Sequence, residues 1–79
     1  MNKAFVLINC ELGSEIQVLE DLKNIECVKS VQGVFGAYDV LANLECEQHE
    51  ELRQNIISTI RNIKNVRSTM TLMAINKQC

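Results

Sequence analysis

The distribution of apolar residues along the chain predicts four strands and two helices. Short apolar or alternating runs rich in β-branched residues are typical of strands, whereas apolar residues that recur every three or four positions are typical of helices. The expected strands cover residues 3–10, 27–33, 38–45 and 66–75, and the expected helices cover residues 15–24 and 47–63. The order of elements is therefore β-α-β-β-α-β.

Each predicted helix has one apolar face. These faces consist of Val18, Leu19, Leu22 and Ile25 in the first helix and of Leu52, Ile56, Ile60 and Ile63 in the second. Ser14 and Gln17 have the spacing of a capping box, in which two side chains bond reciprocally to the backbone of the first helical turn. We therefore expect the first helix to begin just after Ser14.

An internal repeat supports this order of elements. The segment LKNIECVKSV, residues 22–31, aligns without gaps with IRNIKNVRST, residues 60–69. Both segments run from the end of a helix into a strand, and two copies of one β-α-β unit build a ferredoxin-like sandwich. We expect an α+β fold in which a four-stranded antiparallel sheet carries two helices on one face.

The strands have apolar residues on both faces, although two helices can cover only one face of the sheet. The first strand alternates Ala4, Val6 and Ile8 with Phe5 and Leu7, and the last alternates Met70, Leu72 and Ala74 with Met73 and Ile75. The second strand is expected to place Val28, Ser30 and Gln32 on one face. Because a large exposed apolar patch marks a site of association, we expect a homodimer packed sheet against sheet.

Size and charge narrow the classes of function. The chain has 79 residues, a net charge of −2 and a sequence pI of about 5.3. Nucleic-acid-binding surfaces are usually basic, so we expect no direct binding to nucleic acid. The apolar run at residues 4–8 is far shorter than the roughly 20 residues of a membrane span, and no secretory signal is present. We expect a cytoplasmic protein without membrane contact.

The cysteines show no metal-binding pattern. Cys10, Cys27, Cys46 and Cys79 form no C-x-x-C pair, and the chain has a single histidine. Without a secretory signal or the loop-rich composition of a disulfide scaffold, the pattern predicts reduced thiols. We expect no metal site and no cofactor.

Signals for catalysis are weak. His49 lies in the first turn of a polar helix without a patterned nucleophile, and a catalytic histidine needs partners around it. The acidic residues Glu45, Glu47, Glu50 and Glu51 are typical of a solvated helix start. We predict no catalytic residues and no enzyme activity.

The segment VQGVFGAYDV, residues 31–40, contains more special residues than a hairpin turn requires. Gly33 and Gly36 are expected to supply positive φ, and Tyr38 is expected to be half-buried at the start of a strand. This interpretation leaves Asp39 unexplained, since it precedes the apolar run VLANL. A carboxylate in that place suits an amine of a partner molecule or backbone donors of the loop.

The runs VFGAYDVLANLE and NVRSTMTLMAI resemble the ligand-binding domain of the leucine-responsive and asparagine regulator (Lrp/AsnC) family, also called the regulation-of-amino-acid-metabolism (RAM) domain. The most specific marks are G-x-Y-D at residues 36–39 and T-x-T at residues 69–71. Full-length members have a helix-turn-helix domain before this one. We expect residues 1–79 to form a single effector-binding domain with no DNA-binding domain.

The resemblance implies a binding site and an assembly. Members dimerise through their sheets and form rings of four or five dimers, octamers or decamers, with effectors that are usually amino acids held between dimers. Carried over by motif, the ligand-binding residues are Gly36, Tyr38, Asp39, Thr69 and Thr71. Asp39 would take the α-amino group of the effector, and loop amides would take its carboxylate.

Three classes of function follow. The first is an amino-acid-sensing and oligomerisation domain that modulates transcription by itself or through a full-length Lrp/AsnC-type regulator. The second is a structural assembly subunit without a ligand. The third is an enzyme of the same fold, such as an acylphosphatase-like hydrolase or a small oxygenase. The phosphate loop of acylphosphatases works with an arginine, and none follows VQGVFG here.

Overall fold

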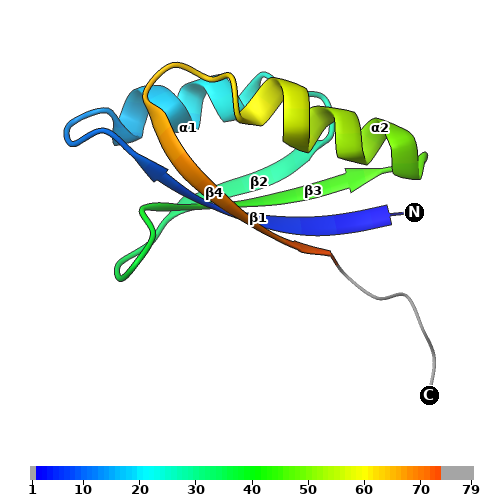
Figure 1. Ribbon diagram of the computed structural model, residues 1–79, viewed down its shortest axis with the longest axis horizontal. Coiled ribbons are helices and arrows are strands. Elements are labelled where there is room, and N and C mark those ends of the chain that lie inside the picture. Colours follow the sequence, from blue (N-terminus) through cyan, green and yellow to red (C-terminus); the bar gives the residue numbers. More distant parts are fainter. Residues whose placement is uncertain (1, 74–79) are drawn as a thin grey trace.

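The computed structural model describes residues 2–73, and its elements follow the predicted order (Figure 1). The strands are β1 (Asn2–Cys10), β2 (Val28–Gly33), β3 (Val40–Cys46) and β4 (Val66–Met73). The helices are α1 (Glu15–Lys23) and α2 (His49–Gln54), and α2 continues into the π-helical segment η1 (Asn55–Ile60). The predicted end of the last strand, Ala74 and Ile75, lies outside the described residues. No helix within residues 2–73 has the length and apolar character required to cross a membrane.

The four strands form one antiparallel sheet in the order β2-β3-β1-β4. β1 is central, with Ala4 opposite Leu44 of β3 on one side and opposite Met73 of β4 on the other. Both helices lie on the same side of the sheet, and the turn between β2 and β3 projects away from them (Figure 1). This arrangement confirms the predicted ferredoxin-like sandwich.

The core lies between the helices and the covered face of the sheet. The apolar faces predicted for the helices supply it from one side, and alternate residues of β1 and β3 supply it from the other. Leu22 and Ile60, which occupy equivalent positions in the internal repeat, are both fully buried. The repeat therefore reports a real structural equivalence, because each copy ends its helix with a core residue before the chain enters a strand.

The other face of the sheet has an apolar patch that no helix covers. Phe5 lies opposite Leu72, and Leu7 lies between Met70 of β4 and Leu41 of β3. Phe5, Met70 and Leu72 are 38%, 46% and 50% exposed. We call these five residues, Phe5, Leu7, Leu41, Met70 and Leu72, the open-face patch. Their alternation with the buried residues of β1 confirms the predicted two-sided pattern.

Two local expectations are wrong. The Ser14 side chain makes no capping bond, and Gln17 instead donates to Asp21 Oδ1 at 3.1 Å. Ser14 has φ −103° and ψ 5°, away from the extended geometry in which an N-cap hydroxyl reaches the first turn. In the β2–β3 turn, Gly36 has φ +126° whereas Gly33 does not have positive φ, because Gly33 still pairs with Val40 in the sheet.

A β-bulge in β2 changes which residues share a face. Val28 lies opposite Leu44 but Ser30 lies opposite Asn43, so Lys29 is the extra residue. An extra residue reverses the alternation of side chains beyond it. Val28 therefore packs against the core together with Val31, and the predicted grouping of Val28 with Ser30 and Gln32 is wrong. Arg67, the repeat equivalent of Lys29, is the residue skipped in the pairing of β4 with β1.

The expectation of reduced thiols is wrong for two of the cysteines. Cys27 and Cys46 form a disulfide, with Cα atoms 5.4 Å apart. β2 and β3 are neighbours, and the Glu45 N–H donates to the Cys27 carbonyl at 2.8 Å. The pairing of the two strands thus brings the start of β2 beside the end of β3, a contact that spacing along the sequence does not reveal.

Reduction of this disulfide is expected to lower the free energy of unfolding by about 2–4 kcal/mol, because the bond restricts the unfolded chain. Urea unfolding with and without a phosphine reductant, in the presence of a metal chelator, measures the change. A Cys27→Ser, Cys46→Ser double variant should have the unfolding midpoint of the reduced protein, and the reductant should not change that midpoint. Equal midpoints for the oxidised and reduced protein would contradict the prediction.

Candidate functional site

The turn between β2 and β3 is held by backbone hydrogen bonds at Asp39. The Val34 N–H donates to the Asp39 carbonyl at 2.9 Å and closes the turn. The Asp39 N–H donates to the Ile8 carbonyl, also at 2.9 Å, and ties the turn to β1. Gly36 lies within this turn with a positive φ that other residues rarely adopt. The turn therefore places the Asp39 side chain beside the end of β1.

The Asp39 carboxylate caps that end of β1. Its Oδ2 accepts a hydrogen bond from the Cys10 N–H at 3.0 Å and lies 3.9 Å from Cys10 Sγ. The sequence suggests either an amine of a partner molecule or a backbone donor of the loop as the partner of Asp39. The structure provides a backbone donor, which comes from β1 and not from the loop. A carboxylate has about four acceptor sites, so this bond leaves capacity for a further donor.

Asp39 also lines a hollow of about 320 Å³ together with Asn9, Cys10, Arg67 and Ser68. We call this the Asp39 hollow. It contains one carboxylate and one guanidinium besides neutral hydrogen-bonding groups. Arg67 Nε lies 3.4 Å from Glu11 Oε2, but both side chains are more than half exposed. Because exposed ion pairs contribute little free energy, Arg67 can exchange this partner for another anion.

Cys10 is a buried free cysteine at the wall of the Asp39 hollow. Burial is the largest cause that raises the pKa of its thiol, and the negative charge of Asp39 raises it further, with Glu15 and Glu11 adding to the effect. The thiol is therefore protonated at neutral pH. A proton on Sγ also allows the thiol to donate toward Asp39 Oδ2.

The rate of Cys10 alkylation is expected to have a pH midpoint above that of a free cysteine, because the thiolate is the reactive form. Asp39→Asn removes a nearby negative charge and should move the midpoint to lower pH. Iodoacetamide labelling of the oxidised protein, followed by mass spectrometry of the Cys10 peptide, measures both. The Asp21→Asn variant serves as a control with the same loss of charge elsewhere. A midpoint that is unchanged in Asp39→Asn would exclude the proposed electrostatic coupling.

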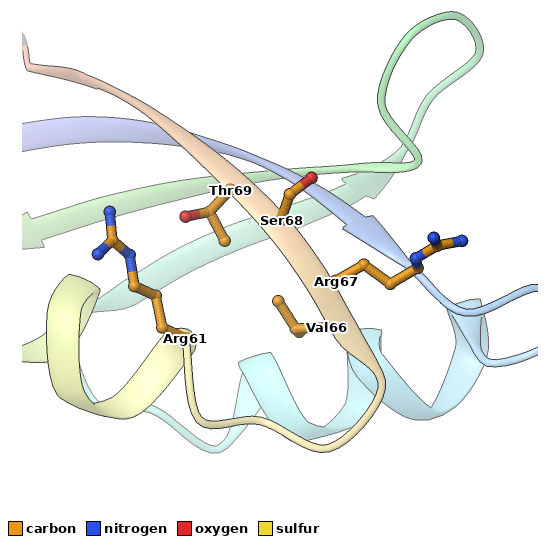
Figure 2. A pocket seen from close by; sticks show the side chains of 5 residues that line it. All are labelled: Arg61, Val66, Arg67, Ser68 and Thr69. Atoms are coloured by element: carbon orange, nitrogen blue, oxygen red, sulfur yellow. The ribbon is translucent and has the colours of Figure 1, made fainter.

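Two further hollows lie on the helix side of β4. The first, of about 340 Å³, is lined by Arg61, Val66, Arg67, Ser68 and Thr69 (Figure 2). Figure 2 shows Arg61 extending from the end of the second helix alongside β4 at the level of Thr69. The second, of about 360 Å³, shares Arg61 and is lined also by His49, Arg53, Ile56, Thr71 and Met73. Arg61 thus joins two hollows, although no motif in the sequence singles it out.

The five predicted ligand-binding residues do not meet in one hollow of a single chain. Thr69 and Thr71 lie opposite Ile8 and Val6, on the covered side of the sheet, and line the two hollows beside Arg61. Asp39 lines its own hollow, whereas Gly36 and Tyr38 line none of the three. Gly36 is exposed and Tyr38 is half-buried. That these five residues bind one ligand stays a prediction, and it requires residues from a second copy of the chain to complete the site.

The comparison with known protein families covers nearly the whole chain. The family described as Lrp/AsnC ligand binding domain matches residues 3–78. Among curated proteins, homocitrate synthase of Sulfurisphaera tokodaii is 36% identical over 76 residues, which is 95% of this chain and 16% of the synthase. The chain therefore spans about one sixth of the length of the curated relatives it matches.

Solved structures agree with the family match. The hypothetical protein PHS023 from Pyrococcus horikoshii is 32% identical, with a TM-score of 0.89 over 98% of this chain and 93% of that chain. AsnC of E. coli has a TM-score of 0.87 over 99% of this chain and 53% of its own, and at 20% identity it shows a shared fold alone. Through its match at residues 3–78, the chain belongs to the Lrp/AsnC ligand-binding domain family.

Proposed function

We propose that this regulatory ligand-binding domain senses an amino acid and that the Asp39 hollow holds its charged backbone groups. The observation that carries the proposal is the presence of opposite charges in the lining of one hollow, where Asp39 supplies a carboxylate and Arg67 a guanidinium. The ammonium of an amino acid would lie against Asp39 and its carboxylate against Arg67. Asn9 and Ser68 supply neutral hydrogen-bonding groups to the same hollow.

A homodimer formed through the open-face patch is the second part of the proposal. Its central residues are exposed and apolar in the isolated chain, and burying apolar surface contributes about 25 cal/mol per Å². A second copy presents the same patch, so a twofold contact is self-complementary. Assembly of such dimers into octamers or decamers would bring Gly36, Tyr38, Thr69 and Thr71 of neighbouring copies toward a common ligand.

Two kinds of protein are candidates for regulation by this domain when it binds its effector. Membership of a family of regulators supports control of transcription, with a full-length Lrp/AsnC-type regulator as the partner and no direct binding of nucleic acid by this acidic domain. Similarity to a segment of homocitrate synthase supports control of an enzyme by an attached domain, with no catalysis by the domain itself. A cytoplasmic location fits both, since some organisms keep disulfides in intracellular proteins.

A thermal-shift screen against the twenty amino acids, with light scattering on every hit, tests the proposal. The best amino acid should raise the melting temperature and change the mass of the assembly. Its amide and its decarboxylated amine each lack the carboxylate, and the matching carboxylic acid lacks the ammonium, so all three should bind weakly. The absence of a shift with every amino acid at millimolar concentration would leave the domain as a structural subunit and contradict the proposal.

A further inference from the structure

The disulfide lies at the opposite end of β3 from the Asp39 turn, in a hollow of about 370 Å³. Cys27 immediately precedes β2, Cys46 ends β3, and Glu51 belongs to the first turn of α2. The start of β2 therefore meets the segment that joins β3 to α2 here, 19 residues further along the chain. Both cysteines are buried, at 5% and 2% exposure, whereas Glu51 is exposed at the rim.

These three residues have the chemistry of a metal site. The sulfur atoms of Cys27 and Cys46 and a carboxylate oxygen of Glu51 all lie within 4.8 Å of one another. Two thiolates and one carboxylate are ligands that zinc prefers, and three protein ligands with a water in the fourth position form a common tetrahedral set. With Cα atoms 5.4 Å apart, both cysteine side chains can reach one ion at the usual Zn–S distance of about 2.3 Å.

We propose that, when the Cys27–Cys46 disulfide is reduced, Cys27, Cys46 and Glu51 bind a zinc ion. Reduction requires two electrons and two protons, which a dithiol supplies as it becomes a disulfide itself. Zinc then displaces the two thiol protons into the solvent and binds both thiolates. Because one pair of sulfur atoms forms either the S–S bond or two Zn–S bonds, oxidation releases the ion, and the bound ion protects the thiolates from oxidation.

The side chain of Asn55 contacts both Cys27 and the backbone of Glu51. Its Nδ2 donates to the Glu51 carbonyl at 2.8 Å and lies within hydrogen-bonding distance of Cys27 Sγ, at 3.7 Å. A donor to the sulfur stabilises the thiolate that a metal needs, and such outer partners orient metal ligands. The same side chain thus connects the two elements that supply Cys27 and Glu51.

The electrostatic surroundings favour a cation. Glu26, Glu45, Glu47 and Glu51 all line the hollow, and Lys29 is the one basic residue among the described residues that line it. Lys3 Nζ lies 3.8 Å from Glu45 Oε2, so one of the four carboxylates already has a partner. The remaining negative charge attracts a divalent ion, whereas the disulfide by itself gains nothing from these carboxylates.

Cobalt absorption tests the site directly, because Co²⁺ replaces zinc in thiolate sites and is coloured there. The full chain is reduced with a phosphine, freed of reductant without oxygen, and titrated with Co²⁺. We expect thiolate-to-cobalt charge-transfer bands and tetrahedral d–d bands that saturate at one ion per chain and disappear when one equivalent of zinc is added. The oxidised protein should show none of these bands.

Variants separate the proposed ligands from general effects. Cys27→Ser and Cys46→Ser should each abolish the charge-transfer bands, and Glu51→Gln should weaken zinc binding at least about tenfold. Glu50→Gln, the neighbouring exposed acid, and Cys10→Ala should leave affinity unchanged. Circular dichroism monitors folding, and restoration of the fold by zinc in a reduced chain that unfolds without it would support the site.

Two results would overturn the proposal. One is a reduced, folded chain that shows no cobalt bands, or a reduced chain that shows none and that zinc does not refold. The other is equal zinc affinity of Glu51→Gln and Glu50→Gln, which would show that the carboxylate is not a ligand. Neither result concerns the Asp39 hollow, so the proposed effector site is tested independently of the zinc site.

Discussion

Replacing Met70 by lysine is expected to convert the proposed dimer into folded monomers. Met70 lies on the uncovered face of the sheet, opposite Leu7 and remote from the helix-covered core. A lysine there costs the isolated chain little, because its ammonium reaches water. In a sheet-to-sheet dimer the same ammonium is buried without a partner, which costs about 3–5 kcal/mol.

The twofold symmetry of the contact doubles this cost. Each dimer contains the substitution twice, so the total cost is about 6–10 kcal/mol and the dissociation constant rises at least about ten-thousandfold. Leu72→Lys, on the same face, should act in the same way. Light scattering at micromolar concentration measures the mass, and circular dichroism confirms that the fold persists.

Leu12→Lys is the matched control, since it adds the same charge at a site that is 97% exposed and lies between β1 and α1, outside the open-face patch. This variant should stay dimeric. A monomeric unmodified chain at micromolar concentration would show that the proposed dimer does not form. A Met70→Lys variant with the mass of the unmodified dimer would show that the dimer does not use this face.

The features of the fold that the sequence predicts are those set by periodic burial. The spacing of Leu52, Ile56 and Ile60 locates the second helix because these side chains all reach one core. The predicted range, residues 47–63, is too long at both ends, since α2 begins at His49 and η1 ends at Ile60. The internal repeat supports the topology for the same reason, since Leu22 and Ile60 end their helices in equivalent places. The periodicity of apolar residues is sufficient to predict an element when one of its faces packs against the core.

Features that depend on pairing between strands are not predicted from the sequence. The bulge at Lys29 follows from the register between β2 and β3, and it separates Val28 from Ser30, with which it is predicted to share a face. The Cys27–Cys46 bond has the same origin, because only the pairing of these strands brings the two sulfur atoms together. Register is a tertiary property, and no signal within either strand encodes it here.

The candidate site is predictable in part. Asp39 is conspicuous in the sequence because a carboxylate precedes a buried strand, and the structure gives it a backbone partner, Cys10. Arg67 is not conspicuous, since it is one of the eight lysines and arginines of the chain and lies outside both the G-x-Y-D and the T-x-T motif. It enters the Asp39 hollow because the irregular pairing of β4 and the order of the strands place it near Asp39.

The exchange of Asp39 for asparagine is expected to weaken amino-acid binding by about 2–5 kcal/mol while it leaves folding nearly unchanged, because the ammonium of the ligand would lose its charged partner. The asparagine side-chain oxygen can still accept the hydrogen bond from the Cys10 N–H that Asp39 Oδ2 accepts. Calorimetry with the best amino acid of the thermal-shift screen measures affinity, and urea unfolding measures stability.

Asp39→Ala removes both the charge and the acceptor, and comparison of the two variants separates the roles of the carboxylate. The alanine variant leaves the Cys10 N–H without its partner, so it should lose about 1–2 kcal/mol of stability in addition to the loss of affinity. Asp21→Asn, in α1, controls for the change in net charge and should alter neither property, because the asparagine oxygen can still accept the hydrogen bond from Gln17. If Asp39→Asn binds the ligand as the unmodified chain does and only Asp39→Ala is destabilised, the carboxylate acts solely as a cap of β1. A loss of affinity in both variants, with a loss of stability in the alanine variant alone, means that the carboxylate caps β1 and binds the ammonium of the effector at the same time.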